Sequence, residues 1–162
     1  MLQAPLSGRP CVIYEFVVVA KMSIGGGGQI WRHLVDMREG SSFLVVDDSG
    51  TARVDTSGPY RLAQTDDRIG TTSGCYPGTH RALSQFLEAS GIKPTNWLGR
   101  WREIHYAERV LEPGALVSVG GVGVWEVDPD GDRDSPHSLP RRLVLCGTES
   151  EPLLIGAETV EG

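Results

Sequence analysis

Short runs of β-branched and aromatic residues, separated by glycine, proline and aspartate, constrain most strongly how this chain can fold. The runs fall at residues 11–22, 29–38, 43–46, 51–55, 104–111, 116–127, 142–146 and 153–155. Such side chains pack well on a pleated sheet and lose rotamer freedom in a helix. The pattern therefore predicts seven or eight short strands and a mainly β (α+β) fold.

Turn residues stand between several of these runs. Residues 25–28 are four consecutive glycines, and residues 47–50 read Asp-Asp-Ser-Gly, which is typical of a hairpin turn. Residues 112–114 read Glu-Pro-Gly, which favours a tight reversal. Within 116–127, glycines at 120, 121 and 123 predict a bulge or a sharp corner in the strand.

One segment, 79–91, has the periodicity of a helix. Leu83, Phe86 and Leu87 are spaced i, i+3 and i+4, which places them on one face. Thr79 can cap the N-terminus of this helix, and Gly91 is a suitable residue to end it. The sequence therefore predicts one helix near residues 80–90.

Two segments, 56–79 and 128–140, have no repeating apolar period, and we expect them to form long loops. One helix among short antiparallel strands predicts a small β-barrel or half-barrel of the oligonucleotide/oligosaccharide-binding (OB) type, because barrel closure removes exposed strand edges. We expect the whole chain, 1–162, to form a single domain of this kind.

The acidic balance of the chain argues against nucleic acid as its main partner. Asp and Glu number 21 against 15 Lys and Arg, which gives a net charge of -6. Nucleic-acid backbones bind clustered cations, so the overall charge has the wrong sign. Single-strand nucleic-acid binding by an OB-type domain is therefore the last of three hypotheses.

No segment has the length of a membrane-spanning helix. The longest apolar stretch, 11–20, contains Glu15 and is shorter than the ~20 residues needed to cross a bilayer. Residues 1–5 have neither the cationic region nor the apolar region of a secretory signal peptide. We expect this chain to contain no membrane-spanning segment and no signal peptide.

Neither the cysteines nor the histidines have the spacing of metal ligands. Cys11, Cys75 and Cys146 form no Cys-x-x-Cys pair, and none of the four histidines has an i, i+4 partner. Residues 126–131 match the first part of a calcium loop, but His137 occupies the position where a glutamate is required. We predict no metal and no cofactor.

An arrangement for covalent catalysis is the second hypothesis. Cys75 lies in a polar segment and is the best candidate for a nucleophile, with His80 or His105 as its base. A thiol needs such a neighbour to lower its pKa. This hypothesis predicts a small-ligand or hydrolytic pocket, and the alternative is that Cys75 is a small residue in a loop.

An aromatic and cationic cluster carries the leading hypothesis, which is a protein-binding surface. The cluster consists of Trp97, Trp101 and Tyr106 near Arg100, Arg102 and Arg109. The contact set that it predicts is Trp97, Trp101, Arg102, Tyr106 and Glu108. Aromatic rings beside arginines anchor protein partners or stack on nucleobases. They can equally join a helix to a sheet, with the arginine stems covering the indole rings.

Tyr106 and Glu108 alternate along one predicted strand, and alternating residues of a strand lie on the same face. They can therefore present a hydroxyl and a carboxylate together, either to a ligand or to Arg53 in a structural pair. No set of acid, base and nucleophile accompanies them, so the sequence favours a module without catalytic activity.

Four segments occur in an order typical of a known domain. They are APLSGRPCVIYE at residues 4–15, FLVVDDSGTARVD at 43–55, YAERVLEPGALVSVGG at 106–121 and PLLI at 152–155. Together they resemble the GIDE domain, which is also called the BAM domain. The similarity extends from residue 4 to residue 156.

The resemblance implies a domain held beside a membrane, as in prokaryotic proteins and in a mitochondrial outer-membrane ubiquitin ligase. In that ligase the domain engages partner proteins, while a separate RING domain transfers ubiquitin. The zinc-ligand cysteines of a RING are missing here, so ubiquitin ligase activity is not expected.

The resemblance also implies a location, which is the cytoplasmic or membrane-associated face of a prokaryotic cell. The family usually has another strand before the segment at 4–15, and we expect this chain to lack that first strand. The partner that the resemblance implies is a protein.

Overall fold

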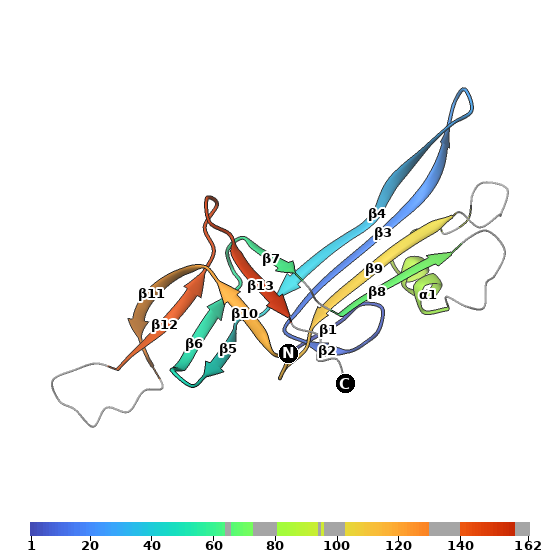
Figure 1. Cartoon of the computed structure of the whole chain (residues 1–162). Helices are drawn as coiled ribbons and strands as arrows, with labels where there is room; N and C mark the ends of the chain where they lie inside the picture. The colour runs from blue at the N-terminus through green and yellow to red at the C-terminus, as the bar shows by residue number, and fades with distance from the viewer. Residues whose placement is uncertain (64–65, 73–80, 94, 96–102, 130–139, 158–162) are drawn as a thin grey trace. The chain divides into compact units, whose positions relative to one another are not determined.

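The computed structural model describes residues 1–63, 66–72, 81–93, 95, 103–129 and 140–157 (Figure 1). The chain divides into two compact units, of which the first contains residues 1–39 and 66–112 and the second 40–65 and 113–162. This division does not fix a domain boundary, so the single domain expected over 1–162 stays a prediction.

The first unit is built around a four-stranded sheet with the order β4-β3-β9-β8. Its strands are β3 (Ile13–Ile24), β4 (Gly28–Gly40), β8 (Asp66–Thr72) and β9 (Ile104–Leu111). β9 is antiparallel to both β3 and β8. The other elements of this unit are β1 (Leu2–Gln3), β2 (Pro10–Cys11), which pairs antiparallel with β1, and α1 (Arg81–Ala89).

One face of this sheet carries the hydrophobic core of the first unit. Successive side chains of a strand point to opposite faces, so alternate residues of β3 are buried. The core contains Tyr14, Phe16, Val18 and Ala20 from β3, Ile104 and Val110 from β9, and Leu83 and Leu87 from α1. The rings of Phe16 and Phe86 meet edge to face with their centroids 5.1 Å apart, so α1 packs on this face.

The helix α1 confirms the helix predicted near residues 80–90. Leu83 and Leu87 are both buried, as their i, i+4 spacing predicts. The backbone N–H of Ile92 donates a hydrogen bond to the carbonyl of Leu87, and Gly91 has a φ of 72°. Glycine adopts this left-handed conformation readily and ends the helix as predicted. The predicted cap, Thr79, lies outside the described residues.

The second unit contains two sheets. The four-stranded sheet has the order β11-β12-β6-β5 and consists of β5 (Phe43–Asp47), β6 (Gly50–Asp55), β11 (Val122–Val127) and β12 (Arg141–Cys146). The three-stranded sheet has the order β10-β13-β7 and consists of β7 (Tyr60–Ala63), β10 (Val117–Gly120) and β13 (Leu153–Ala157). The pairs β12–β6 and β13–β7 are parallel, whereas β5–β6, β11–β12 and β10–β13 are antiparallel.

The β5–β6 hairpin confirms the turn predicted at residues 47–50. The carboxylate of Asp47 accepts hydrogen bonds from the hydroxyl of Ser49 (2.6 Å) and from the backbone N–H groups of Ser49 (2.8 Å) and Gly50 (3.1 Å). The bond from the Ser49 hydroxyl is the main cause that lowers the pKa of Asp47. The ionised carboxylate therefore stabilises the turn.

The glycine-rich run at 116–127 is interrupted, as predicted, where the chain passes from one sheet to the other. β10 ends at Gly120 and β11 begins at Val122. A Cβ atom at Gly121 would lie 2.7 Å from Cδ1 of Leu153 and 2.9 Å from the carbonyl oxygen of Cys146. Only glycine fits at this corner without a shift of its neighbours.

The prediction of one long loop over 56–79 is wrong, because β7 and β8 lie within it. In β7, Tyr60 and Leu62 are buried between exposed neighbours, but this alternation is only four residues long. β8 begins with Asp66 and Asp67, which are poor strand formers. It lies at an edge of its sheet and pairs with β9, so it forms through tertiary contacts that local propensity does not show.

The mainly β fold with one helix is confirmed. Among the residues that the structure describes, the strands form four open sheets, so these residues form no closed barrel. Open sheets have edge strands, and in the described residues these are present at both sides of each sheet. The loop predicted over 128–140 lies largely outside the described residues.

Candidate functional site

The structure describes two of the five residues predicted to contact a partner. Trp97, Trp101 and Arg102 lie outside the described residues, whereas Tyr106 and Glu108 lie on β9. In the register of β3 and β9, Tyr106 is opposite Val18 and Glu108 is opposite Phe16. Both side chains therefore lie on the face that carries the core, and Tyr106 is half-buried against it.

Glu108 is fully buried and holds the N-terminal loop. Its Oε1 accepts a hydrogen bond from the backbone N–H of Leu6 (2.6 Å), and the N–H of Ser7 lies 3.2 Å from Oε1 and 3.1 Å from Oε2. A buried carboxylate is stable when backbone N–H groups satisfy its oxygens. The structure thus gives Glu108 a structural role, and its contact with a partner stays a prediction.

The loop that Glu108 holds is compact. The backbone N–H of Gly8 donates to the carbonyl of Ala4, and that of Ala4 donates to the carbonyl of Arg9. Arg9 also forms an ion pair with Glu112, the residue that follows β9. Its Nη1 lies 2.9 Å from Oε1 of Glu112. The N-terminal loop and the end of β9, which are about a hundred residues apart in sequence, therefore meet here.

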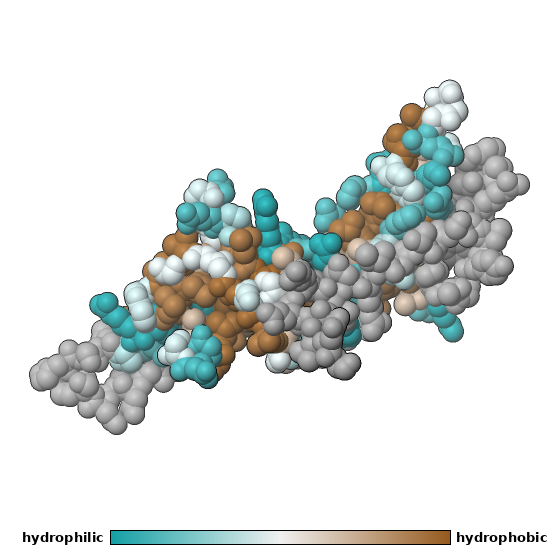
Figure 2. Space-filling model, viewed as in Figure 1, coloured by the Kyte–Doolittle hydropathy of each residue, from teal (hydrophilic) through white to brown (hydrophobic). Residues whose placement is uncertain are grey.

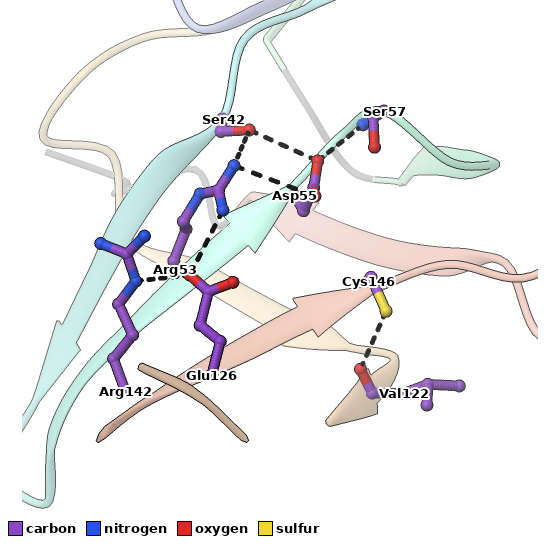
Figure 3. A network of polar contacts seen from close by, with 8 residues as sticks. All are labelled: Ser42, Arg53, Asp55, Ser57, Val122, Glu126, Arg142 and Cys146. Carbon is purple, nitrogen blue, oxygen red and sulfur yellow. Dashed lines mark hydrogen bonds and ion pairs between the residues drawn. The ribbon is translucent and has the colours of Figure 1, made fainter. Parts of the chain in front are cut away.

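Cys11 follows the loop and is fully buried. Burial raises the pKa of the Cys11 thiol, and the charge of Glu108 raises it further. A thiol in such an environment stays protonated and unreactive. Cys146 is half-buried, and its thiol lies 3.6 Å from the carbonyl oxygen of Val122, to which it donates (Figure 3).

His105 is one of the two histidines predicted as the base, and the structure places it beside an aromatic ring and a carboxylate. The rings of His105 and Trp31 meet edge to face with their centroids 4.5 Å apart. Nε2 of His105 lies 3.5 Å from Oε1 of Glu103. Lys21 donates to Oε2 of Glu103 at 3.1 Å, which is the main cause that lowers the pKa of Glu103. Cys75 and His80 lie outside the described residues, so the catalytic hypothesis stays untested.

The second unit leaves large apolar side chains in contact with solvent, which the sequence reading did not single out. Figure 2 shows apolar side chains gathered over the strands of this unit. The exposed ones are Leu44, Val46, Leu116, Val124, Trp125, Val127 and Leu154. Val46 is 75% exposed and Trp125 is 64% exposed, so neither belongs to the core of the described part of the chain.

A charged network crosses the four-stranded sheet of the second unit (Figure 3). Glu126 on β11 accepts a hydrogen bond from Nε of Arg142 on β12 at 2.6 Å, and Nη1 of Arg53 on β6 lies 3.4 Å from the same oxygen. The bond from Arg142 is the main cause that lowers the pKa of Glu126. Arg142 also lies 3.6 Å from Asp128.

This network gives Arg53 partners other than Glu108, which was one predicted pairing. Its Nη2 lies 3.4 Å from the hydroxyl of Ser42 and 3.9 Å from Oδ2 of Asp55. Asp55 accepts a hydrogen bond from the backbone N–H of Ser57 at 3.0 Å, which is the main cause that lowers the pKa of Asp55. The cations and carboxylates of this face therefore compensate one another.

The lowered pKa of Asp55 predicts a pH dependence of stability. Its folded pKa lies below its unfolded value of about 3.9, so Asp55 stabilises the fold above that value and the contribution is lost as pH falls through the folded pKa. The contribution should be about 1 kcal/mol or less, because solvent screens a partly exposed group. We expect the free energy of unfolding of the Asp55→Asn chain, measured in urea, to fall less steeply between pH 5 and pH 3 than that of the unchanged chain.

Asp48→Asn, in an exposed turn, is the control. If the free energies of unfolding of both variants fell equally steeply with pH, the prediction would be contradicted.

Among the described residues, no three His, Cys, Asp or Glu side chains lie close enough together to hold a metal ion. Within the same residues, the helix is too short and too polar to cross a membrane. Comparison of the chain with family models, curated proteins and solved structures found no match.

Proposed function

We propose that this chain is a GIDE-type module that binds a protein partner and has no catalytic activity of its own. The observation that carries the proposal is the group of apolar side chains exposed on the second unit (Figure 2). Exposed apolar side chains favour protein contact, because water is released when a partner covers them. Trp125 is a suitable anchor, since tryptophan is enriched among the residues that dominate binding energy.

The neighbours of the apolar residues also suit a protein interface. The register places the network of Arg53, Glu126 and Arg142 on the face of the four-stranded sheet that also carries Leu44, Val46 and Val124, whereas Trp125 and Val127 lie on the other face. Interfaces combine an apolar centre with a polar rim that fixes the register of the partner. The compensated charges of this network add little net charge to the surface, so the partner does not need to be strongly charged.

The ionisable groups described in the structure support a binding role over a catalytic one. Glu108 is occupied by backbone N–H groups, Cys11 is buried with a raised pKa, and Glu126 is paired with Arg142. A catalytic acid, base or nucleophile must reach its substrate. These three groups instead stabilise the fold.

The proposed setting is the cytoplasmic or membrane-associated face of a prokaryotic cell, which the resemblance to the GIDE domain supports. The proposed partner is a protein at or in that membrane. Ubiquitin ligase activity forms no part of the proposal, because the zinc-ligand cysteines of a RING are missing from the sequence.

Photo-crosslinking from the exposed surface tests this proposal. A photoreactive phenylalanine analogue in place of Trp125 should yield discrete crosslinked proteins in the membrane fraction of a prokaryotic lysate. An excess of unlabelled chain should compete for them, and an excess of the Trp125→Ser chain should compete at least tenfold less well. The same analogue at Lys93, an exposed position in the first unit, is the control.

The result that would overturn the proposal is identical labelling from both positions, or labelling that unlabelled chain does not reduce. The predicted contact residues are tested in the same assay. If Trp97 and Trp101 contribute to binding, the chain with alanine at both positions should also compete poorly. Full competition by that variant would remove these two residues from the contact set without affecting the role of Trp125.

A further inference from the structure

The strand β5 (Phe43–Asp47) is an edge of the four-stranded sheet, with β6 as its neighbour in the described part of the chain. Its first four residues, Phe-Leu-Val-Val, carry no charge. Leu44 is 61% exposed and Val46 is 75% exposed, and both lie on one face because they alternate. An apolar, uncharged edge strand is a template for pairing with another strand.

The other edge strands of the three larger described sheets carry a charge before their last residue or partly bury their apolar side chains. β4 carries Arg32, Asp36, Arg38 and Glu39, β8 begins with two aspartates, β7 contains Arg61 and β11 contains Glu126. β10 is uncharged, but its two valines are half-buried. Charges on edge strands normally prevent sheets from joining. The only charge of β5, Asp47, is its last residue, so four consecutive uncharged apolar residues lie along this edge.

We propose that β5 pairs antiparallel with β5 of a second copy of this chain, so that two four-stranded sheets become one continuous sheet. Side chains directly opposite each other in an antiparallel pair lie on the same face of the sheet. The two-fold axis must therefore pass midway between one residue of β5 and the same residue of the second copy. With the axis at Val45, Leu44 lies opposite Val46 of the second copy, and Val46 lies opposite the second copy's Leu44. The exposed aliphatic side chains then cover each other.

The charges of the strand fit this register. Asp47 lies opposite Phe43 of the second copy, so no like charges meet directly. The two Asp47 residues stand four residues apart along the strand direction, which is about 13 Å. This separation exceeds the Debye length of ~8 Å at physiological ionic strength, so their repulsion is screened. A second copy therefore supplies a strand of matching polarity, length and charge.

Sedimentation velocity of the full chain over a concentration series tests the proposal. The mass of the main species should rise from 17.5 kDa toward twice that value as the concentration increases. Val46→Lys should keep the chain at the mass of one copy over the same series, because it introduces two close positive charges at the pairing edge. Ile30→Lys, a change at an exposed aliphatic residue of β4 in the first unit, should behave as the unchanged chain.

A cysteine scan tests the register and does not depend on the lysine variant. In a chain with serine at Cys75 and Cys146, Val45→Cys should form an intermolecular disulfide in oxidised glutathione at least tenfold faster than Phe43→Cys. The axis places Val45 opposite Val45 of the second copy, whereas it places Phe43 opposite Asp47 of the second copy. The proposal fails if the unchanged chain stays at one copy throughout, if Val46→Lys still dimerises, or if the two cysteines react equally. If β5 pairs only with a peptide of another protein, the unchanged chain stays at the mass of one copy. The photo-crosslinking from Trp125 would then still succeed.

Discussion

Replacing Glu108 with alanine is expected to lower the free energy of unfolding by about 2–4 kcal/mol. The substitution removes a fully buried carboxylate and leaves the backbone N–H groups of Leu6 and Ser7 without their acceptor. Each unsatisfied buried donor costs about 1–3 kcal/mol, and the lost side chain adds a cavity. The loop that precedes Cys11 should detach first, since Glu108 accepts hydrogen bonds from the backbone of Leu6 and Ser7 in this loop.

Urea unfolding followed by tryptophan fluorescence measures this loss, and proteolysis near residues 4–9 reports on the loop. Glu112→Ala is the matched control, because Glu112 is partly exposed and forms an ion pair with Arg9 at the other side of the same loop. That surface pair contributes about 1 kcal/mol or less. Glu108→Gln should fall between the two, because its amide keeps one acceptor oxygen. Equal stabilities of the Glu108→Ala and Glu112→Ala chains would contradict the structural role of Glu108.

The strands and the helix were predictable from sequence wherever local pattern and tertiary contact agree. The strand at 104–111 has the predicted bounds, and the turn at 47–50 forms because Asp47 can reach its own turn amides. β8 could not be predicted in the same way. Its residues 66–68 are charged, and it is a strand only because β9 supplies the hydrogen-bonding partner.

The candidate site was less predictable, because its contacts join residues that are distant in sequence. Glu108 and Leu6 are 102 positions apart, and Arg53 and Glu126 are 73 apart. The alternation of Tyr106 and Glu108 correctly placed both on one face of a strand, but whether that face points to solvent or to the core depends on the packing of α1. The exposure of Trp125 depends likewise on how the sheets of the second unit pack.

In the second unit, Gly147→Ala is expected to lower the free energy of unfolding by about 2–4 kcal/mol. Gly147 lies where the chain passes closely by the start of β7 and β13. A Cβ atom there would overlap the carbonyl oxygen of Pro59 and lie 2.6 Å from the backbone nitrogen of Leu153. These two atoms form a hydrogen bond of 2.9 Å that begins the parallel pairing of β13 with β7. The added methyl group therefore forces apart two backbone segments, which cannot move aside as a flexible side chain can.

Gly120→Ala is the matched control for this prediction. Gly120 lies on β10, and a Cβ atom there would meet no other atom within 4 Å. The change should alter the free energy of unfolding by about 1 kcal/mol or less, in the stabilising direction, because alanine restricts the unfolded chain. Urea unfolding of both variants, with circular dichroism to follow the strands, measures the difference. Equal free energies of unfolding for Gly147→Ala and Gly120→Ala would show that the chain does not pass as close to Pro59 as described. The parallel pairing of β13 with β7 would then be contradicted as well.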